Sequence, residues 1–581
     1  MLRSSRTVVS LVHTLMLSTP VAASVVVSLA ATGCKDESQP EYWVEKIQDP
    51  AWQANSVKRL EQFFEDTYTR ANKDVGAAEV KALADKVVDP LTKVYVDHYG
   101  DLDEKTRESL IKLIASFRDK RSEPALKKAF DEFAKSGKGG EDVRWAARAT
   151  ADMKLDGTAD SMGQAFDKMK AAKVGQSVFI DFKEAMLAHP SASWSGMLKM
   201  HLEPEIVPPT DGGKDAEALD RFKNEQYWQT VAAQVLGELR DASAVDPLVK
   251  VMLDPRKADV QTTAALALVK IGKPAAQKAV KIVSDQDPDM AAYCAARTQK
   301  ATGASEAPKD KPHIATAALI LGVMGRPDTL DAMVAALKGA KDDATRAILA
   351  REIAKIPPTP ASKDAFKAAF EATPLSAQIP PGANALQTLT ESAGQFYDAD
   401  FVPWLLERAD KTKGGGDEKT LLQSTATITA IKLMKADQTG PVNDAVNKWG
   451  TAIEKDAYKL ATELLKACGD RVSCYLANLE KSENQTKTRQ SVGIKAGYMI
   501  GEYGDEKARG EIIDRLGSID NAAVRFVAGQ TIDFLSPKGS KDAADALEKI
   551  IDKNAKTADK DKIAGDAPLK QIMYRIRARA E

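Results

Sequence analysis

This chain of 581 residues contains few cysteines and few histidines, and its positive and negative charges nearly balance. Four cysteines are too few for a fold held together by disulfides, and five scattered histidines leave little material for a metal enzyme. Lysine and arginine number 82 against 83 aspartates and glutamates, whereas a nucleic-acid-binding protein needs a net basic face. The 44% of apolar residues excludes a disordered chain. We therefore expect no metal, no cofactor and no nucleic-acid partner.

The motifs of the common catalytic sites are missing as well. None of the histidines is followed by glutamate, H-E-x-x-H and G-x-S-x-G are absent, and residues 137–140 lack the spacing of a phosphate-binding loop. The acidic run 285–289 is spaced like a calcium loop. However, Met290 and Ala296 stand where that loop needs glycine and glutamate. We predict no catalytic residue, and we interpret 285–289 as the start of a helix.

The first 33 residues are typical of an export signal rather than of a folded domain. Arg3 and Arg6 give a positive start, and no charged residue occurs in the apolar stretch 7–33. The small residues directly before Cys34 resemble the lipobox of bacterial lipoproteins, although Ala31 occupies the position where leucine is commonest. This resemblance implies that Cys34 is acylated and becomes the mature N-terminus. Its lipid would anchor the protein to a membrane without spanning it.

Two alternative interpretations of residues 1–33 remain. This segment is long enough to be an uncleaved transmembrane anchor, although His13 and Pro20 make it a poor one. Ordinary signal cleavage after Ala23 or Ala31 would instead release a soluble protein. In all three interpretations the rest of the chain is exported. Because Lys35 follows the cysteine, where aspartate is the familiar signal for inner-membrane retention, the lipoprotein interpretation favours the outer membrane of a bacterial envelope.

A pattern of small and apolar residues, A-A-x-x-L-G, recurs along the chain, in several places about 32 residues apart. Each occurrence predicts the first of two amphipathic helices, in which small residues let the neighbouring helix approach closely. Acidic or Asp-Pro steps at 89–90, 254–255 and 285–289 predict helix starts, because aspartate caps free N–H groups and proline suits the first turn. The clearest occurrences of the pattern are 232–237, 264–272, 317–322, 496–501 and 528–532.

This repetition resembles the HEAT-repeat family and the related bilin-lyase-type repeats. Residues 284–292 come close to the family's D-x-D-P-x-V-R-x-x-A repeat start, and 141–144 and 521–525 keep its Val-Arg pair. The resemblance implies an all-α fold, an α-solenoid of stacked antiparallel helix pairs. Such an array grows without a closed core, so one continuous repeat domain is expected rather than three or four globular ones.

The chain divides into six predicted segments by the clarity of these repeats. They are a signal peptide (1–33), a short tether (34–41), degenerate helical repeats (42–222), clear HEAT-like repeats (223–356), helical repeats with loop insertions (357–484), and C-terminal HEAT-like repeats with a cap (485–581).

Cys468 and Cys474 enclose a predicted corner between two helices, with Gly469 at the turn. A Cα separation suited to a disulfide is plausible there, and an exported chain permits one, so we predict that they are joined. The alternative is two reduced cysteines buried between helices. Cys294 then has no partner and is predicted to be a small core residue, and Trp145, inside a repeat helix, is also predicted to be core.

Stacked helix pairs build an extended concave surface, and proteins of this architecture commonly use it to bind other proteins. The predicted function is therefore a non-catalytic, membrane-tethered scaffold or adaptor with a protein partner. One alternative is a ligand-binding protein or lyase-like enzyme of the HEAT-like group, which would show a deep pocket lined by histidine or cysteine. Another is a structural envelope protein, which would show a featureless concave face.

Overall fold

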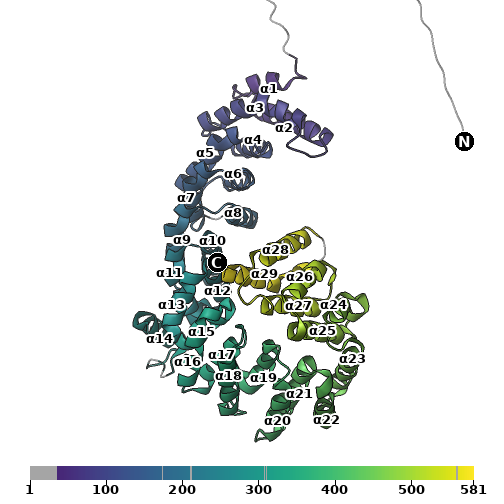
Figure 1. Cartoon of the computed structure of the whole chain (residues 1–581). Coiled ribbons are helices and arrows are strands. Elements are labelled where there is room, and N and C mark those ends of the chain that lie inside the picture. Colours follow the sequence, from purple (N-terminus) through teal and green to yellow (C-terminus); the bar gives the residue numbers. More distant parts are fainter. Residues whose placement is uncertain are drawn as a thin grey trace, which may run out of the picture.

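The computed structural model describes residues 36–580, apart from 173, 210–211, 307, 309 and 558–559. The predicted signal peptide and Cys34 lie outside the described residues. The described part is all-α, as predicted: its helices stack in antiparallel pairs along one continuous path, so that each pair contacts the next (Figure 1).

The paired helices form an outer and an inner row. The outer row consists of α1 (Pro40–Lys46), α3 (Ala78–Asp97), α5 (Glu123–Ser136), α7 (Ala159–Met169), α9 (Ser195–His201), α11 (Val245–Met252), α13 (Lys273–Val283), α16 (Leu330–Gly339), α18 (Pro360–Ala372), α20 (Phe401–Lys411), α22 (Thr439–Trp449), α24 (Val472–Glu480), α26 (Glu506–Arg515) and α28 (Lys541–Ala555). The inner row consists of α2 (Gln53–Arg70), α4 (Glu104–Ser116), α6 (Gly140–Met153), α8 (Gln176–Ala188), α10 (Ala216–Leu239), α12 (Ala258–Ile271), α15 (Pro312–Met324), α17 (Asp343–Ile353), α19 (Ala385–Ala393), α21 (Gly416–Leu433), α23 (Ala452–Cys468), α25 (Gln490–Tyr503), α27 (Ala522–Phe534) and α29 (Lys560–Ala580).

Two elements stand outside these rows. Helix α14 (Pro288–Thr302) is an extra helix between α13 and α15, and it projects from the side of the molecule (Figure 1). Strands β1 (Gln378–Ile379) and β2 (Ala383–Asn384) form a two-residue antiparallel hairpin in the connection between α18 and α19. Within the described residues, no helix is both long and apolar enough to cross a membrane.

Most of the predicted helix starts are confirmed. The side chain of Asp254 accepts a hydrogen bond from the backbone of Arg256, and Asp287 caps α14 by accepting from the backbone of Met290. The run 285–289 therefore opens a helix, as predicted. The prediction of a helix start at 89–90 was wrong, because Pro90 lies inside α3. The apolar face of α3, buried over four turns, outweighs the hydrogen bond that a proline removes.

The small residues of the repeated pattern lie where neighbouring inner helices touch. A Cβ atom added to Gly237 on α10 would lie 2.8 Å from the Cα atom of Ala267 on α12. One added to Gly497 on α25 would lie 2.5 Å from a methyl group of Val527 on α27. Real Cβ atoms do not approach other atoms so closely, so these positions need glycine to keep the repeats stacked.

The C-terminal repeats curl back on the middle of the chain and close a ring. Helix α29 packs against α12 and α15, so the C-terminus lies beside repeats more than 250 residues earlier (Figure 1). Arg326, after α15, donates a hydrogen bond of 2.8 Å to the backbone oxygen of Ala578, and the ammonium group of Lys270 lies 4.1 Å from the ring centroid of Tyr574. We call α11–α29 the ring and α1–α9 the arm; α10 joins them.

Candidate functional site

The arm carries an open groove, which runs across the inner helices α2, α4, α6 and α8 and has a volume of about 570 Å³. Its floor is rich in alanine, which leaves room for an approaching chain. We call it the arm groove. It is lined by Phe64, Glu65, Tyr68, Val75, Ala115, Ser116, Arg118, Trp145, Arg148, Ala149, Ala151, Asp152, Asp181, Glu184, Ala185 and Ala188.

Trp145 lies in the arm groove and is only half-buried, so the prediction that it is core was wrong. Three cations surround its ring: the Arg148 guanidinium lies 5.3 Å from the ring centroid, that of Arg144 5.6 Å, and the Lys112 ammonium 5.8 Å. These cation–π contacts hold the indole upright between neighbouring repeats. Its free edge is therefore an apolar contact already fixed in place.

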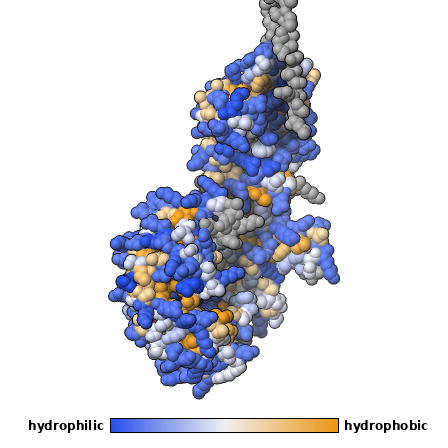
Figure 2. Space-filling view, turned by 90° about the vertical axis from the view of Figure 1, so that its right-hand side faces the viewer, coloured by the Kyte–Doolittle hydropathy of each residue, from blue (hydrophilic) through white to orange (hydrophobic). Residues whose placement is uncertain are grey.

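Some of the carboxylates that line the arm groove form ion pairs with arginine and others do not, within the described residues. Arg148 and Arg118 form ion pairs with Asp181 (3.3 Å) and Asp152 (3.0 Å) respectively. Glu65 on α2 and Glu184 on α8 also line the groove and are exposed, and neither forms an ion pair within the described part of the chain. The groove thus combines an apolar centre with acidic edges. The face in Figure 2 is mostly hydrophilic, with apolar residues in small separate spots over arm and ring.

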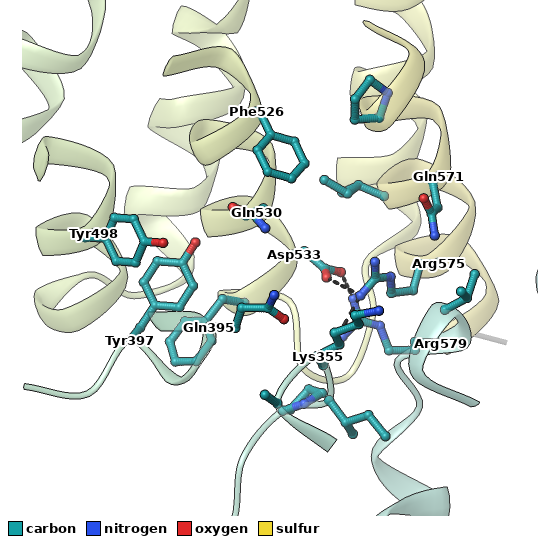
Figure 3. A pocket seen from close by; sticks show the side chains of 17 residues that line it. Lys355, Gln395, Tyr397, Tyr498, Phe526, Gln530, Asp533, Gln571, Arg575 and Arg579 are labelled. Carbon is teal, nitrogen blue, oxygen red and sulfur yellow. Dashed lines mark hydrogen bonds and ion pairs between the residues drawn. The ribbon is translucent and has the colours of Figure 1, made fainter. Parts of the chain in front are cut away.

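The ring encloses a second, smaller space of about 230 Å³, the ring cavity. The inner helices α15, α27 and α29 and the segments after α17 and α19 contribute to its wall, so it exists only because the ring is closed (Figure 3). Apolar contacts come from Phe526, 41% exposed, and from Phe534, Pro568 and Ile572.

Three cationic side chains and one carboxylate line the ring cavity. Arg575 and Arg579 both pair with Asp533, Arg575 at 3.0 Å. Lys355 lies beside these arginines (Figure 3), with Arg575 donating to its backbone oxygen at 3.5 Å, and its ammonium group pairs with Glu352 at 2.6 Å. Glu352 also accepts from Arg351 at 2.7 Å. Each carboxylate is therefore shared by two cations, which leaves the wall with surplus positive charge. Burial lowers the pKa of Lys355, with Glu352 partly opposing this shift.

Several polar side chains that line the ring cavity form no hydrogen bond with other described residues. The side-chain amides of Gln395, Gln530 and Gln571, on three different elements, form no hydrogen bond within the described residues (Figure 3). The hydroxyl of Tyr498, a residue only 8% exposed, has no partner there either, whereas that of Tyr397 lies 3.4 Å from the Thr531 hydroxyl. Burial raises the pKa of Tyr498 to about 12, so its hydroxyl stays a neutral donor.

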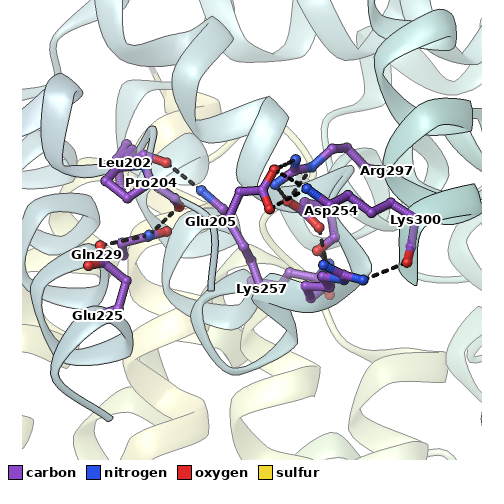
Figure 4. Close-up of polar contacts among 11 residues, drawn as sticks. Leu202, Pro204, Glu205, Glu225, Gln229, Asp254, Lys257, Arg297 and Lys300 are labelled. Atoms are coloured by element: carbon purple, nitrogen blue, oxygen red, sulfur yellow. Dashed lines mark hydrogen bonds and ion pairs between the residues drawn. The ribbon is translucent and has the colours of Figure 1, made fainter. Parts of the chain in front are cut away.

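A third polar cluster ties α14 to the junction of arm and ring (Figure 4). Arg297 on α14 donates to Asp254 (2.7 Å) and to Glu205 (2.5 Å), and Lys300 pairs with Glu205. Hydrogen bonds from Lys300 and Arg297 lower the pKa of Glu205 to about 2. Lys257, which is 2% exposed, donates to the backbone oxygen of Leu202 just after α9. Arg297, Lys300, Asp254 and Glu205 bind one another and Lys257 binds the backbone beside them, which is the behaviour of a structural clamp.

Lys257 gives the clamp a measurable pH dependence. Burial lowers the pKa of this lysine from 10.5 to about 8. At a pH between the folded and unfolded pKa values, the lysine is protonated more often in the unfolded chain than in the folded chain. The contribution of Lys257 to the free energy of unfolding therefore rises with pH. Chemical denaturation measures the free energy of unfolding of the wild type and of Lys257→Met at each pH. As the pH is raised from 7 to 10, we expect this free energy to rise for the wild type relative to the variant. Lys223→Met, at an exposed position of α10, should show no such trend. A constant difference between Lys257→Met and wild type would contradict the buried position.

Cys468 ends α23 and Cys474 lies in the first turn of α24, with Gly469 at a φ of 61° between them. The structure pairs the two cysteines, whose Cα atoms are 5.4 Å apart. Cys294 is buried on α14, as predicted, and burial raises its pKa to about 11.

The cysteine pairing is also a prediction for the purified protein. Peptide mapping without reduction should find the Cys468 and Cys474 peptides linked, with only Cys294 alkylated among these three after denaturation. If both Cys468 and Cys474 were alkylated without reduction, the pairing would be wrong. Reduction should cost about 2 kcal/mol of stability, because the closed loop is short.

Histidines form no catalytic or metal cluster in the described part of the chain. His98, His189, His201 and His313 each lie beside an aspartate within 3.5 Å. His201 stacks on Trp228 in the core, where burial lowers its pKa. No group of three or more His, Cys, Asp or Glu residues among those described is placed to hold a metal ion. Neither the arm groove nor the ring cavity is lined by histidine or cysteine.

Residues 217–297 match the family model of HEAT repeats. This segment is made of HEAT repeats. It spans α10 to α13 and most of α14 and overlaps the predicted clear repeats over 223–297, where the prediction of HEAT-like repeats is confirmed. The same pairing of outer and inner helices continues through the arm and the rest of the ring. No curated protein matches the chain.

The sequence alone predicted neither the arm groove nor the ring cavity. The ring cavity depends on contacts between α29 and α12, which no local pattern encodes. The arm groove had one visible signal, since Arg144 and Arg148 flank Trp145 at helical spacing. Cations one and three positions from a tryptophan indicate a partly exposed ring more often than a core one.

Proposed function

We propose that this HEAT-repeat protein is a non-catalytic scaffold, exported and anchored by lipid at Cys34, that binds a partner protein in the arm groove. The observation that carries this proposal is the partly buried Trp145 in a groove whose exposed edge carboxylates, Glu65 and Glu184, form no ion pair with other described residues. The partner's contacting segment would place an apolar side chain against Trp145. It would bring lysine or arginine side chains to Glu65 and Glu184.

Closure of the ring supports the choice of the arm. The inner face of an open solenoid offers a long surface to a partner, but the pocket found on the inner side of the ring has a volume of about 230 Å³. That volume admits a small molecule and not a folded domain. The inner face of the arm stays open and holds the larger groove, and tryptophan is enriched among the residues that dominate binding energy at protein interfaces.

Site-specific photo-cross-linking in intact cells tests the partner. A photoreactive residue at Ala188, in the groove, should capture one recurrent protein. The same residue at Lys127, exposed on the outer helix α5, should not capture it. Trp145→Ala and Glu184→Lys should each reduce the capture about tenfold or more, since a central aromatic contact is worth 2 kcal/mol or more. Equal capture from both faces, or capture indifferent to Trp145→Ala, would contradict the proposal.

The lipid anchor has its own test, independent of the groove. Cys34→Ala should release the protein from the membrane fraction. A Cys34→Ala protein that still fractionates with membranes would contradict acylation at this cysteine and favour the uncleaved anchor. Density separation of wild-type membranes then distinguishes outer from inner membrane, and the outer membrane is expected.

A further inference from the structure

The ring cavity has the chemistry of a ligand site that the scaffold function does not use. We propose that it binds a small organic anion, with a carboxylate or phosphate group held by Arg575 and Lys355 and an apolar body held between Phe526 and Ile572. This inference concerns the ring and does not depend on the partner proposed for the arm.

The charges around the cavity favour an anion. Asp533 is shared by Arg575 and Arg579, and Glu352 is shared by Lys355 and Arg351. Cations brought together without matching carboxylates repel one another, and burial strengthens that repulsion. A bound anion beside Arg575 and Lys355, which are neighbours in the cavity, would offset this repulsion. An arginine fork binds carboxylate and phosphate oxygens equally well.

The neutral polar groups point to the same ligand. Gln395, Gln530 and Gln571 present amides with no hydrogen bond in the described part of the protein, and Tyr498 presents an unpartnered hydroxyl. The three glutamines are partly exposed, so their amides are open to the cavity and can bind a ligand there. The three glutamines come from η7 (Gly394–Phe396), α27 and α29, so a single molecule could bridge elements far apart in the sequence. Packing alone gives no reason for this convergence.

Size and apolar lining exclude both a bare ion and a large ligand. A volume of about 230 Å³ would hold roughly eight waters at about 30 Å³ each, which is far more than one inorganic anion needs. It lies just below the range of roughly 300–1,000 Å³ for pockets that hold drug-sized ligands. Phe526, Ile572 and Phe534 would cover the carbon skeleton of a molecule the size of a substituted benzene ring.

Calorimetric titration of the full-length protein with four probes tests this inference. Benzoate and phenyl phosphate carry the two anionic groups on the same apolar ring, benzamide lacks the charge, and inorganic phosphate lacks the ring. At least one of the two aromatic anions should bind. The anion with the higher affinity shows whether the cavity prefers a carboxylate or a phosphate group. Benzamide and inorganic phosphate should bind at least tenfold more weakly than it does.

Variants place the binding in the cavity. Tyr498→Phe and Gln530→Ala remove groups that make no hydrogen bond in the fold, so the protein should fold normally and bind the tighter anion about tenfold more weakly. Arg575→Gln should abolish binding, but it also weakens ring closure, so a loss of binding in this variant has two explanations. Tyr498→Phe and Gln530→Ala are therefore the variants that test the binding site. The inference is overturned if neither aromatic anion binds at millimolar concentration. It is also overturned if Tyr498→Phe and Gln530→Ala both bind like the wild type, or if inorganic phosphate binds as tightly as phenyl phosphate.

Discussion

Replacing Arg525 by methionine destabilises the C-terminal repeats by about 3–5 kcal/mol, the cost of breaking a buried ion pair from one side. Arg525 belongs to the Val-Arg pair at the start of α27 and is 0% exposed. Its guanidinium lies 2.6 Å from Asp566 on α29 and donates to the backbone oxygens of Leu516 and Ile519. Methionine fills the space but leaves the buried Asp566 carboxylate without its cation, with only the hydrogen bond from Asn554, and it removes the donor to two backbone carbonyl groups.

Hydrogen exchange followed by mass spectrometry measures this loss where it occurs, because a long repeat array does not unfold in one step. Amides of α27 and α29 should lose protection in Arg525→Met, while those of α4 and α6 keep it. Arg221→Met is the matched control. Arg221 pairs with Glu217 within α10 on the surface, with side chains 66% and 82% exposed, and such pairs contribute about 0.5 kcal/mol or less. Equal effects of the two variants would show that the Arg525 pair is not buried.

Alanine in place of Gly237 destabilises the stack of α10 on α12, whereas alanine in place of Gly510 stabilises the protein. Both glycines lie inside helices, where alanine alone would add up to about 1 kcal/mol. At Gly237 the new Cβ would lie 2.8 Å from the backbone of Ala267, and forcing helices apart costs about 1–3 kcal/mol. At Gly510, on α26, nothing lies within 4 Å of the added carbon.

Thermal unfolding of the two variants gives the comparison directly. The transition of Gly237→Ala should fall below that of the wild type and that of Gly510→Ala should rise slightly above it. A Gly237→Ala protein as stable as Gly510→Ala would mean that α10 and α12 are farther apart than the structure places them. It would also remove the physical reason for glycine in the repeated pattern.

Local features of this fold could be predicted because short-range physics sets them. The glycine of the repeated pattern predicts close helix contacts, and Gly237 and Gly497 make them. Asp254 and Asp287 predict helix starts, and their side chains accept the capping hydrogen bonds. Pro90 shows the limit of this reasoning, since the buried face of α3 continues through it.

The closed ring could not be predicted in the same way. Curvature arises from a small rotation at every repeat, and errors in it accumulate over the many helices between α12 and α29. Arg326 and Ala578 lie 252 residues apart, and nothing local marks them as partners. The ring cavity could not be predicted either, because residues from distant repeats, such as Lys355 and Arg575, form it. The arm groove lies within neighbouring repeats, and Trp145 was misjudged only because a helical tryptophan resembles a core residue.

Closure of the ring decides which surfaces can bind, so the distance between α12 and α29 is the most direct test of this account. Spin labels at Lys270→Cys and Tyr574→Cys, in a protein with Cys34 and Cys294 replaced by alanine, can be measured by double electron–electron resonance. The Lys270 ammonium lies 4.1 Å from the Tyr574 ring, so a single narrow population of short distances is expected. A broad population of long distances would show an open solenoid, and would contradict both the ring cavity and the choice of the arm as the binding surface.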